Sequence, residues 1–412
     1  MKKLFVIPLV LVVISALIFG GCAKPEPGPG PSTEPLRIGS IESRTGWGGV
    51  YLTDGADLKF AYADYVNARG GIDGRPIEIV EYDDESEAEL GYLYASKLIE
   101  QDKVLAITGP VWTDICLATI EATRYSGCPH IYEGPNTPPP EVYEPGSNIY
   151  ATDLPSGRYF MATVKYLKEK LGAKTLAVLA TTGETGEEDL GWIKDAVAEL
   201  GGIEIVIEER IDPAAIDATP QLTRIKATNP DALHLGGAGN IIGPMMKGYQ
   251  MLGMDMPVAG GTGFITREAS VLIAGFEPEI LILPALRPHV AGFDVLPAGH
   301  PLIELSDTMW DVWSEKYGES RGTKGDILLS WIAWEMDTMD LVCEAIRQAS
   351  PLPEDIQAAR EAIDYALENK IIGFEQRLGR RTITPTDHIG LGVTEDVIFL
   401  TIKDGQIRAL ED

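Results

Sequence analysis

The stretch 104-VLAITGPVWTDICLA-118 decides the fold of this chain. Its apolar run at 104–107 is typical of a strand buried in a parallel sheet, and Gly109-Pro110 ends that run. A helical pattern then starts at Thr113 and Asp114. Its apolar members are Ile115, Leu117, Ala118, Ile120 and Ala122. Open α/β sheets bind ligands at such junctions, and the unpaired first amides of the helix favour an anion there.

Two neighbouring side chains at this junction have two interpretations. The hydroxyl of Thr113 and the indole of Trp112 would lie beside an anion bound at the start of the helix. In the alternative, Thr113 or Asp114 is only a helix cap and Trp112 only packs. The stretch by itself leaves both interpretations open.

Strands and helices alternate on both sides of this stretch. In the N-terminal half we expect strands at 37–41, 77–82, 104–107 and 130–132, with helices at 53–69 and 88–101 and a third from 113. An irregular run follows at 133–147. This order predicts a parallel sheet with helices on both faces, which is the α/β class.

The alternation then restarts, so the chain has a second unit of the same architecture. We expect strands at 175–179, 203–207, 232–235, 257–260 and 279–283, and helices at 159–171, 187–200, 220–227 and 244–252. Three further helices are expected at 301–317, 326–348 and 354–368. A hairpin of strands 396–402 and 406–409 turns at Lys403-Asp404-Gly405.

The N-terminus reads as an export signal. Lys2 and Lys3 precede the apolar run 4–19 and the small residues Gly20-Gly21-Cys22. We expect a signal peptide at 1–21, a lipidated Cys22 that resembles a bacterial lipobox cysteine, and a Pro/Gly-rich tether over 22–35. The rival interpretation is ordinary cleavage with loss of Cys22. The expected location is the periplasm or the cell surface, with a lipid anchor as the only membrane contact.

Composition excludes several classes of function. The 412 residues include 62 acidic and 34 basic side chains, so the formal net charge is -28 and we expect no nucleic-acid partner. The five histidines are scattered, which argues against a metal site. Cys116, Cys128 and Cys343 are expected as three buried thiols without a disulfide.

Catalytic and cofactor motifs are also missing from the sequence. The glycine-rich loops at 45–49 and 260–263 match neither a dinucleotide fingerprint nor a phosphate loop, so we expect no cofactor. No GxSxG elbow occurs, and we expect no enzyme activity. The acidic pair Asp83-Asp84 is interpreted as solvated charge or local capping rather than as a catalytic pair. Trp310 and Trp313, three residues apart in an expected helix, are interpreted as core.

Several of these motifs together resemble one family. They are RIGSI, the TG of the first glycine loop, DGADLKFAYADYVNARGGIDGRPIEIVEYDDESEAELGYLYASKLI, VLAITGPVWTD, VLATTGETGEEDL and PDALHLGGAG. The chain thereby resembles the type I periplasmic binding proteins of branched-chain amino acid ABC transporters, over about 37–346 and more loosely at the C-terminal hairpin. The resemblance implies two Rossmann-like lobes with a ligand cleft between them, joined by three crossovers. Lobe 1 would comprise 36–151 plus 286–387, and lobe 2 would comprise 152–285 plus 388–412.

The resemblance also implies a set of ligand-binding residues. These are Trp47, Trp112, Thr113, Gly134, Asn136, Thr185, Ala238, Thr262 and Trp331, with Trp334 as the alternative to the last. Thr113 would hold a ligand carboxylate. Thr262 stands near the position of the acid that holds the ligand ammonium in the family, so Glu133 or Glu184 is expected as its substitute. Arg44 is expected as an added positive group.

The implied function is an extracytoplasmic solute-binding lipoprotein of an ABC importer. As a monomer, it would capture a small carboxylate-bearing ligand by lobe closure and deliver it to membrane permease subunits. The ligand would be a branched-chain or other amino acid, or an organic or aromatic acid. The alternative is a sensor of the same fold, for an amide or urea-type ligand, that signals to a partner protein.

Overall fold

The computed structural model describes residues 34–133, 139–152, 157–265, 267–285, 301–318, 332–376, 379–391 and 397–410. Residues 35–412 form one compact unit. The signal peptide expected at 1–21 and most of the tether expected over 22–35, including Cys22, lie outside the described residues. So do the predicted ligand residues Gly134, Asn136 and Trp331.

The first sheet is parallel throughout, as the βα alternation predicted. Its strands are β1 (Leu36–Glu42), β2 (Ile77–Asp83), β3 (Ala106–Thr108), β4 (His130–Tyr132) and β5 (Ile149–Ala151), in the order β2-β1-β3-β4-β5. The sequence did not predict β5, because three residues after an irregular run are too few to show a strand period. The carboxyl ends of β1, β3 and β4 therefore meet at one edge of the sheet.

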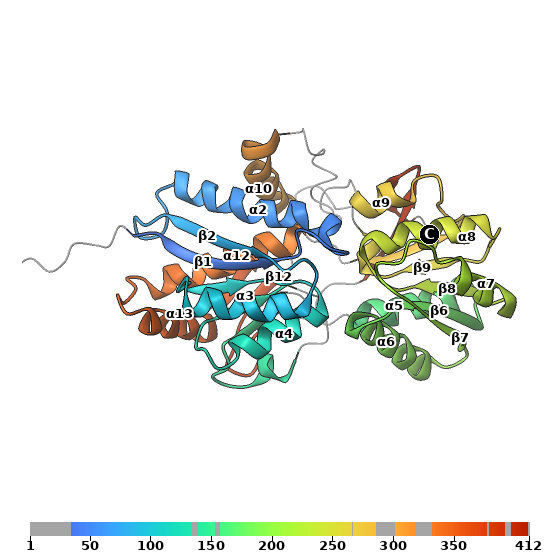
Figure 1. Ribbon diagram of the computed structural model, residues 1–412, viewed down its shortest axis with the longest axis horizontal. Helices are drawn as coiled ribbons and strands as arrows, with labels where there is room; N and C mark the ends of the chain where they lie inside the picture. Colours follow the sequence, from blue (N-terminus) through green and yellow to red (C-terminus); the bar gives the residue numbers. More distant parts are fainter. Residues whose placement is uncertain are drawn as a thin grey trace, which may run out of the picture. The chain divides into compact units, whose positions relative to one another are not determined.

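Helices cover both faces of this sheet (Figure 1). They are α2 (Gly49–Ala68), α3 (Ala88–Glu100), α4 (Thr113–Thr123), α10 (Pro301–Tyr317), α12 (Ile332–Ala349) and α13 (Ile356–Lys370). One hydrophobic core includes Leu58 of α2, Trp313 of α10 and Ile363 of α13, with Trp310 packed against it. A smaller core holds Ile107 of β3 against Leu98 of α3. The interpretation as core is confirmed for Trp313, whereas Trp310 is only partly buried at the edge of the same core.

The second sheet has seven strands. As in the first sheet, its strands alternate with helices along the chain. Its strands are β6 (Thr175–Thr181), β7 (Glu204–Ile211), β8 (Ala232–Leu235), β9 (Val258–Gly260), β10 (Leu281–Ala285), β13 (Ile398–Lys403) and β14 (Gln406–Ala409). The expected hairpin is confirmed, because Lys403 of β13 pairs with Gln406 of β14. It joins the sheet antiparallel to β10 at the edge of the parallel strands.

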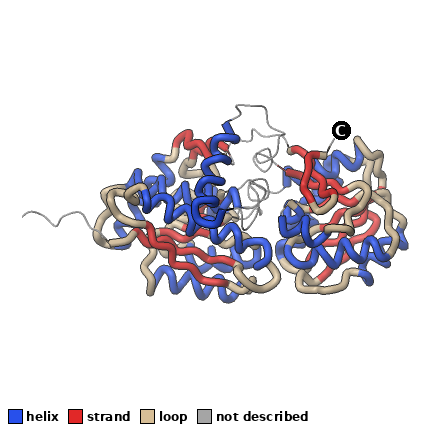
Figure 2. Tube along the Cα trace, turned by 90° about the horizontal axis from the view of Figure 1, so that it is seen from above, coloured by secondary structure: helices blue, strands red, loops and turns tan. Residues whose placement is uncertain are grey.

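Alternate residues of β6 point into two separate cores of the second sheet. Val178 packs with α5 (Gly157–Glu169) and α6 (Glu184–Leu200) on one face. Leu179 packs on the other face with α7 (Thr219–Thr228), α8 (Ile242–Met251) and α9 (Arg267–Ile273). Figure 2 shows strands between helices in both halves of the chain. The 3-10 turns are η1 (Pro140–Tyr143), η2 (Gly239–Ile241) and η3 (Thr262–Phe264).

Several expected boundaries were wrong, and one of them changes the site. Helix α2 begins at Gly49 rather than at 53, and α6 begins at Glu184 rather than at 187. Glycines near both starts lowered the apparent helix propensity, but packing against the sheets overrides it. Leu117, expected on the apolar face of α4, is 42% exposed, and the buried position beside it is Cys116. The chain also forms a hairpin of β11 (Ile372–Gln376) and β12 (Gly379–Thr382), as well as helix α9, which the sequence did not predict.

Candidate ligand-binding site

The loop between β3 and α4 turns on Gly109. Its φ is +76°, and a Cβ placed there would lie 2.4 Å from the carbonyl oxygen of Ile41 in β1. Only glycine accepts both the left-handed conformation and this close approach. The loop therefore passes directly over the end of β1 and delivers Trp112 and Thr113 to the start of α4.

The N-terminus of α4 faces the N-terminus of α6. The hydroxyl of Thr113 donates a hydrogen bond of 2.8 Å to Oε2 of Glu188. The backbone amide of Thr185 donates to Oδ1 of Asp114 at 3.3 Å. Burial raises the pKa of Asp114, whereas the backbone amides of Thr185 and Glu184 oppose that rise. The first turns of two helices from different sheets are thus joined through side chains of α4.

Two tryptophans form an aromatic wall beside this junction. The ring centroids of Trp47 and Trp112 are 4.6 Å apart, and Trp112 is buried. A Cβ at Gly48 would lie 2.2 Å from Nε1 of Trp112, and one at Gly239 would lie 2.5 Å from the carbonyl oxygen of Trp47. Because Gly239 follows the buried Ala238, the wall lies next to the loop after β8.

The structure brings together part of the predicted ligand set. Trp47, Trp112 and Thr113 meet near Thr185, and Ala238 lies one residue from the Gly239 contact with Trp47. The hydroxyl oxygen of Thr185 is buried and has no hydrogen-bond partner among the described residues. Thr262 begins η3, and nothing further is described of its side chain.

Glu188 is the acid that sequence reasoning missed. It lies in the second turn of α6, and its carboxylate accepts the hydrogen bond from the hydroxyl of Thr113. Residue 188 already lay in the helix expected at 187–200, and no local signal in the sequence shows that its side chain meets α4. Of the two acids that the sequence suggested, Glu184 lies at the junction but is exposed, and Glu133 contacts Lys59.

The expectation that Arg44 adds a positive group to the site is wrong. Its guanidinium pairs with Asp57 at 2.6 Å and with Glu81 at 2.9 Å. Burial alone would lower the pKa of Arg44, but the carboxylates of Glu81 and Asp57 raise it. The guanidinium therefore ties β2 to α2 rather than facing the α4–α6 junction.

The acidic loop after β2 shows local capping, one of the two roles expected for it. Asp84 is buried and accepts hydrogen bonds from Ser43 at 2.6 Å and from the amide of Ser86 at 2.8 Å. Asp83 accepts from the amide of Arg44 at 2.9 Å and from the hydroxyl of Thr45 at 2.8 Å. Both carboxylates hold the glycine-rich loop that carries Trp47.

A fully buried charge cluster lies at the carboxyl edge of the first sheet. The ammonium of Lys59 in α2 contacts Glu42 at the end of β1, Glu133 at 2.7 Å and Glu335 of α12 at 2.9 Å. Burial would lower the pKa of Lys59, but the carboxylates of Glu133, Glu335 and Glu42 raise it well above its ordinary value. Burial, and then the charge of Glu335, raise the pKa of Glu42 to about 8.

The three carboxylates of this cluster are close enough to hold a metal ion. Their oxygens lie within 4.8 Å of one another, a spacing that suits a hard divalent cation. The ammonium of Lys59, however, already contacts all three. The chain thus supplies its own cation, and the cluster is best understood as a structural ion network.

The three described cysteines are free and buried, as expected. Burial raises the pKa of Cys128 and of Cys343 to about 12, which keeps both thiols protonated. They therefore act as small apolar side chains.

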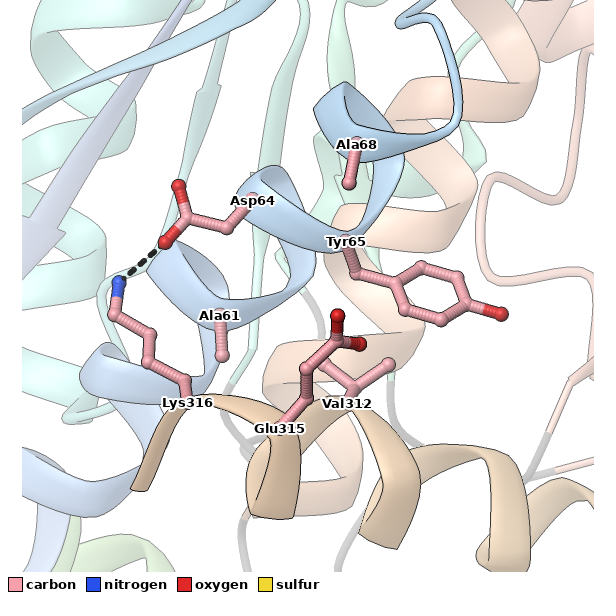
Figure 3. Close-up of a pocket in the computed structure, with 7 residues that line it drawn as sticks. All are labelled: Ala61, Asp64, Tyr65, Ala68, Val312, Glu315 and Lys316. Carbon is pink, nitrogen blue, oxygen red and sulfur yellow. Dashed lines mark hydrogen bonds and ion pairs between the residues drawn. The ribbon is translucent and has the colours of Figure 1, made fainter. Parts of the chain in front are cut away.

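A shallow groove of about 240 Å³ lies between α2 and α10 (Figure 3). Its apolar side chains come from Ala61, Tyr65, Ala68 and Val312, and Asp64 pairs with Lys316 at its rim at 2.8 Å. None of its residues belongs to the predicted ligand set. It is a gap between two helices on one face of the first sheet.

Comparison with known proteins identifies the family. A family model described as periplasmic binding protein matches residues 35–275, more than half of the chain. An amino acid binding protein of Pseudomonas aeruginosa is 25% identical over 59% of this chain and 63% of its own length. A Leu/Ile/Val-binding protein of Escherichia coli is 25% identical over 59% of this chain and 64% of its own length. The chain thus matches under two thirds of each relative.

Solved structures share the fold over most of the chain. An extracellular ligand-binding receptor from Rhodopseudomonas palustris has a TM-score of 0.79 and 22% identity, covering 91% of this chain and 99% of its own. The branched-chain amino acid binding protein LivJ of Streptococcus pneumoniae, in complex with isoleucine, has a TM-score of 0.73 and 22% identity, covering 91% and 98%. A solute-binding protein of R. palustris with benzoate has a TM-score of 0.72 and 18% identity, covering 91% and 95%. All are named as binding proteins or receptors rather than enzymes.

Proposed function

Because the chain belongs to the periplasmic binding protein family, we propose that it is the extracytoplasmic binding lipoprotein of an ABC importer. It captures a small carboxylate-bearing solute between its lobes as a monomer and passes it to permease subunits in the membrane. The lobes are those expected from the sequence, and closure follows from contacts of the ligand with both. Within the described ranges, no helix combines the length and apolar character of a membrane span.

The observation that supports this proposal most strongly is the buried hydroxyl of Thr185. Its oxygen makes no hydrogen bond with a described residue, and a buried polar group without a partner is costly. It lies where the first turns of α4 and α6 meet, beside the Trp47–Trp112 wall. A ligand with polar oxygens at this point satisfies the hydroxyl, and the aromatic wall covers its apolar part.

The proposed ligand is a branched-chain or other amino acid, or an organic or aromatic acid. Thr113 and the first amides of α4 hold its carboxylate, because the helix N-terminus favours negative charge. The proposed ligand set remains Trp47, Trp112, Thr113, Gly134, Asn136, Thr185, Ala238, Thr262 and Trp331. The isoleucine and benzoate bound to two fold neighbours represent these two ligand classes.

Isothermal titration of the purified chain tests this function. The panel contains leucine, valine, benzoate and urea, and binding of at least one carboxylate is the expected result. Urea binding without carboxylate binding would contradict the proposed ligand class. Mass spectrometry of the protein denatured after purification identifies a ligand that was carried along.

Thr113→Ala tests the placement of the ligand carboxylate. We expect this variant to weaken binding by about 1–3 kcal/mol, because a buried acceptor loses its donor. Thr119→Ala in the same helix is the matched control, since its hydroxyl bonds to the carbonyl of Ile115 instead. Equal affinity of wild type and Thr113→Ala would show that the ligand carboxylate binds elsewhere.

The anchor is tested at Cys22. In a bacterial host grown with labelled palmitate, we expect the wild-type chain to carry the label and to sediment with membranes. The variant Cys22→Ser is expected to lose both properties. Label retained in that variant would place the lipid on another residue.

A further inference from the structure

The α4–α6 junction carries more negative charge than a site for a simple anion needs. Asp114 accepts the amide of Thr185, and Glu188 accepts the hydroxyl of Thr113. Glu184 also lies close enough to raise the pKa of Asp114, after the larger effect of burial. A ligand with only negative charge would be repelled by these carboxylates.

The charge of Glu188 also acts on a second side chain of α4. Burial raises the pKa of Cys116 well above its ordinary value, and the charges of Glu188 and Glu133 add to that rise. Cys116 lies one turn after Thr113 in α4. The hydrogen bond to Thr113 places the carboxylate of Glu188 at this helix end, and its effect on Cys116 agrees with that position.

The geometry of the Thr113–Glu188 pair matches an α-amino acid. A hydroxyl donor and a carboxylate acceptor lie next to each other, 2.8 Å apart. In an α-amino acid the carboxylate and the ammonium are attached to one carbon, so they need a donor and an acceptor that are neighbours. The Trp47–Trp112 wall beside this pair also attracts positive charge through its π faces.

We propose that Glu188 binds the ammonium group of the ligand, so that this chain selects α-amino acids over acids that lack the ammonium. The incoming ligand replaces the Thr113–Glu188 hydrogen bond: its carboxylate accepts from Thr113, and its ammonium donates to Glu188. This inference rests on the proposed function and deepens it. It moves the acid for the ammonium from the position of Thr262 to the second turn of α6.

Paired ligands that differ only in the ammonium test this selection. Isothermal titration compares leucine with 4-methylpentanoate, valine with 3-methylbutanoate, and phenylalanine with 3-phenylpropanoate. The proteins are wild type, Glu188→Gln and the control Glu187→Gln. Glu187 is adjacent in sequence, and its carboxylate pairs with Arg210 at 2.5 Å, so the control makes the same change of charge away from the junction.

Wild type is expected to bind the amino acid of at least one pair more tightly than the corresponding acid. Glu188→Gln is expected to lower this preference by about 30-fold or more, as for loss of one partner of a buried charge pair. In Glu188→Gln, the hydroxyl of Thr113 no longer donates to the carboxylate of Glu188. The ligand that lacks an ammonium should therefore bind to this variant as tightly as to wild type or more tightly. A folding defect cannot produce this crossover, since it weakens both ligands. Glu187→Gln should keep the wild-type preference.

Two results overturn the inference in different ways. If wild type binds neither member of any pair, the proposed ligand class is wrong and the inference falls with it. If wild type binds one pair and Glu188→Gln keeps the wild-type preference, the proposed function stands and the role of Glu188 is wrong.

Discussion

Lys59 illustrates how a single side chain can organise charges from several elements. Its ammonium contacts Glu42, Glu133 and Glu335, which come from β1, from the residue after β4 and from α12. It also donates to Ser40 at 3.2 Å and to Thr108 at 3.3 Å. Because every member is buried, removal of the one cation leaves carboxylates without compensation.

Lys59→Met should lower the free energy of unfolding by about 3–5 kcal/mol, as for other broken buried ion pairs. The matched control is Lys316→Met, which removes an exposed pair with Asp64 and should cost under about 1 kcal/mol. Urea unfolding followed by circular dichroism measures both. Addition of Glu133→Gln and Glu335→Gln to Lys59→Met should restore part of the loss. Equal losses for Lys59→Met and Lys316→Met would contradict the network.

The same cluster predicts a pH dependence through Glu42. Burial, and then the charge of Glu335, raise its pKa from 4.5 to about 8 in the folded chain. A raised pKa means that the protonated form stabilises the fold. This contribution is present in full below the unfolded pKa of 4.5, and it is lost as the pH rises through about 8.

We therefore expect the free energy of unfolding of wild type to fall between about pH 4.5 and about pH 8. Glu42→Gln, whose side chain does not titrate, should show a shallower decline over this range. The exposed Glu78→Gln, which makes the same change of charge near Arg37, should keep the wild-type slope. Parallel curves for Glu42→Gln and wild type would rule out a raised pKa at Glu42.

At the scale of elements, the close approach of β1 and the β3–α4 loop sets the position of the site. Gly109 and Gly74 share a φ of +76°, but only Gly109 has a neighbouring atom in the way of a Cβ. That atom is the carbonyl oxygen of Ile41, at 2.4 Å. Comparison of alanine variants at these two glycines therefore separates the free-energy cost of the left-handed backbone from the cost of the steric contact.

Gly109→Ala should destabilise the chain by about 1–3 kcal/mol more than Gly74→Ala, because the added methyl overpacks the junction. Both variants carry the conformational cost of a left-handed alanine. Thermal unfolding compares them. We also expect weaker ligand binding only in Gly109→Ala, since displacement of the loop moves Thr113. Equal stability of both variants would show that the loop relaxes freely.

For the site, the exact residue at which a helix starts mattered more than whether the helix was predicted at all. The predicted alternation of strands and helices from β1 to β4 is confirmed, but β5 was missed and the start of α6 lay three residues earlier than expected. That error placed Thr185 in a loop rather than in the first turn of α6. Glycines and acids near the start of a helix give a weak local signal, whereas the amide contact with Asp114 fixes the start in space.

At the scale of the whole molecule, Arg381 connects segments that are far apart in sequence. It is fully buried in β12 and donates to the carbonyls of Ala151 at 3.0 Å and Thr152 at 2.7 Å. It also donates to the carbonyl of Ile389. These carbonyls lie where the chain leaves the first sheet after β5 and where it approaches β13 of the second sheet, so Arg381 fixes two of the connections between the sheets.

Ligand binding should change the dimensions of the whole molecule. Solution X-ray scattering should give a smaller radius of gyration with saturating ligand than without it, because a ligand that touches both lobes favours their approach. The control is a compound of similar size that titration shows not to bind. An unchanged radius of gyration at saturation would mean that the ligand contacts one lobe only.

The sequence by itself determined the α/β class, the parallel order of the first sheet, the C-terminal hairpin and the family resemblance. These features follow from apolar periodicity and from glycine breaks, which are local in the chain. The stretch 104–118 was correctly identified as a strand, a turn and a helix start. Only the tertiary structure placed Glu188 against Thr113, 75 residues away, and gathered three carboxylates around Lys59. Such contacts depend on how sheets and helices pack. The separation of two residues along the chain therefore does not predict the distance between them in the folded structure.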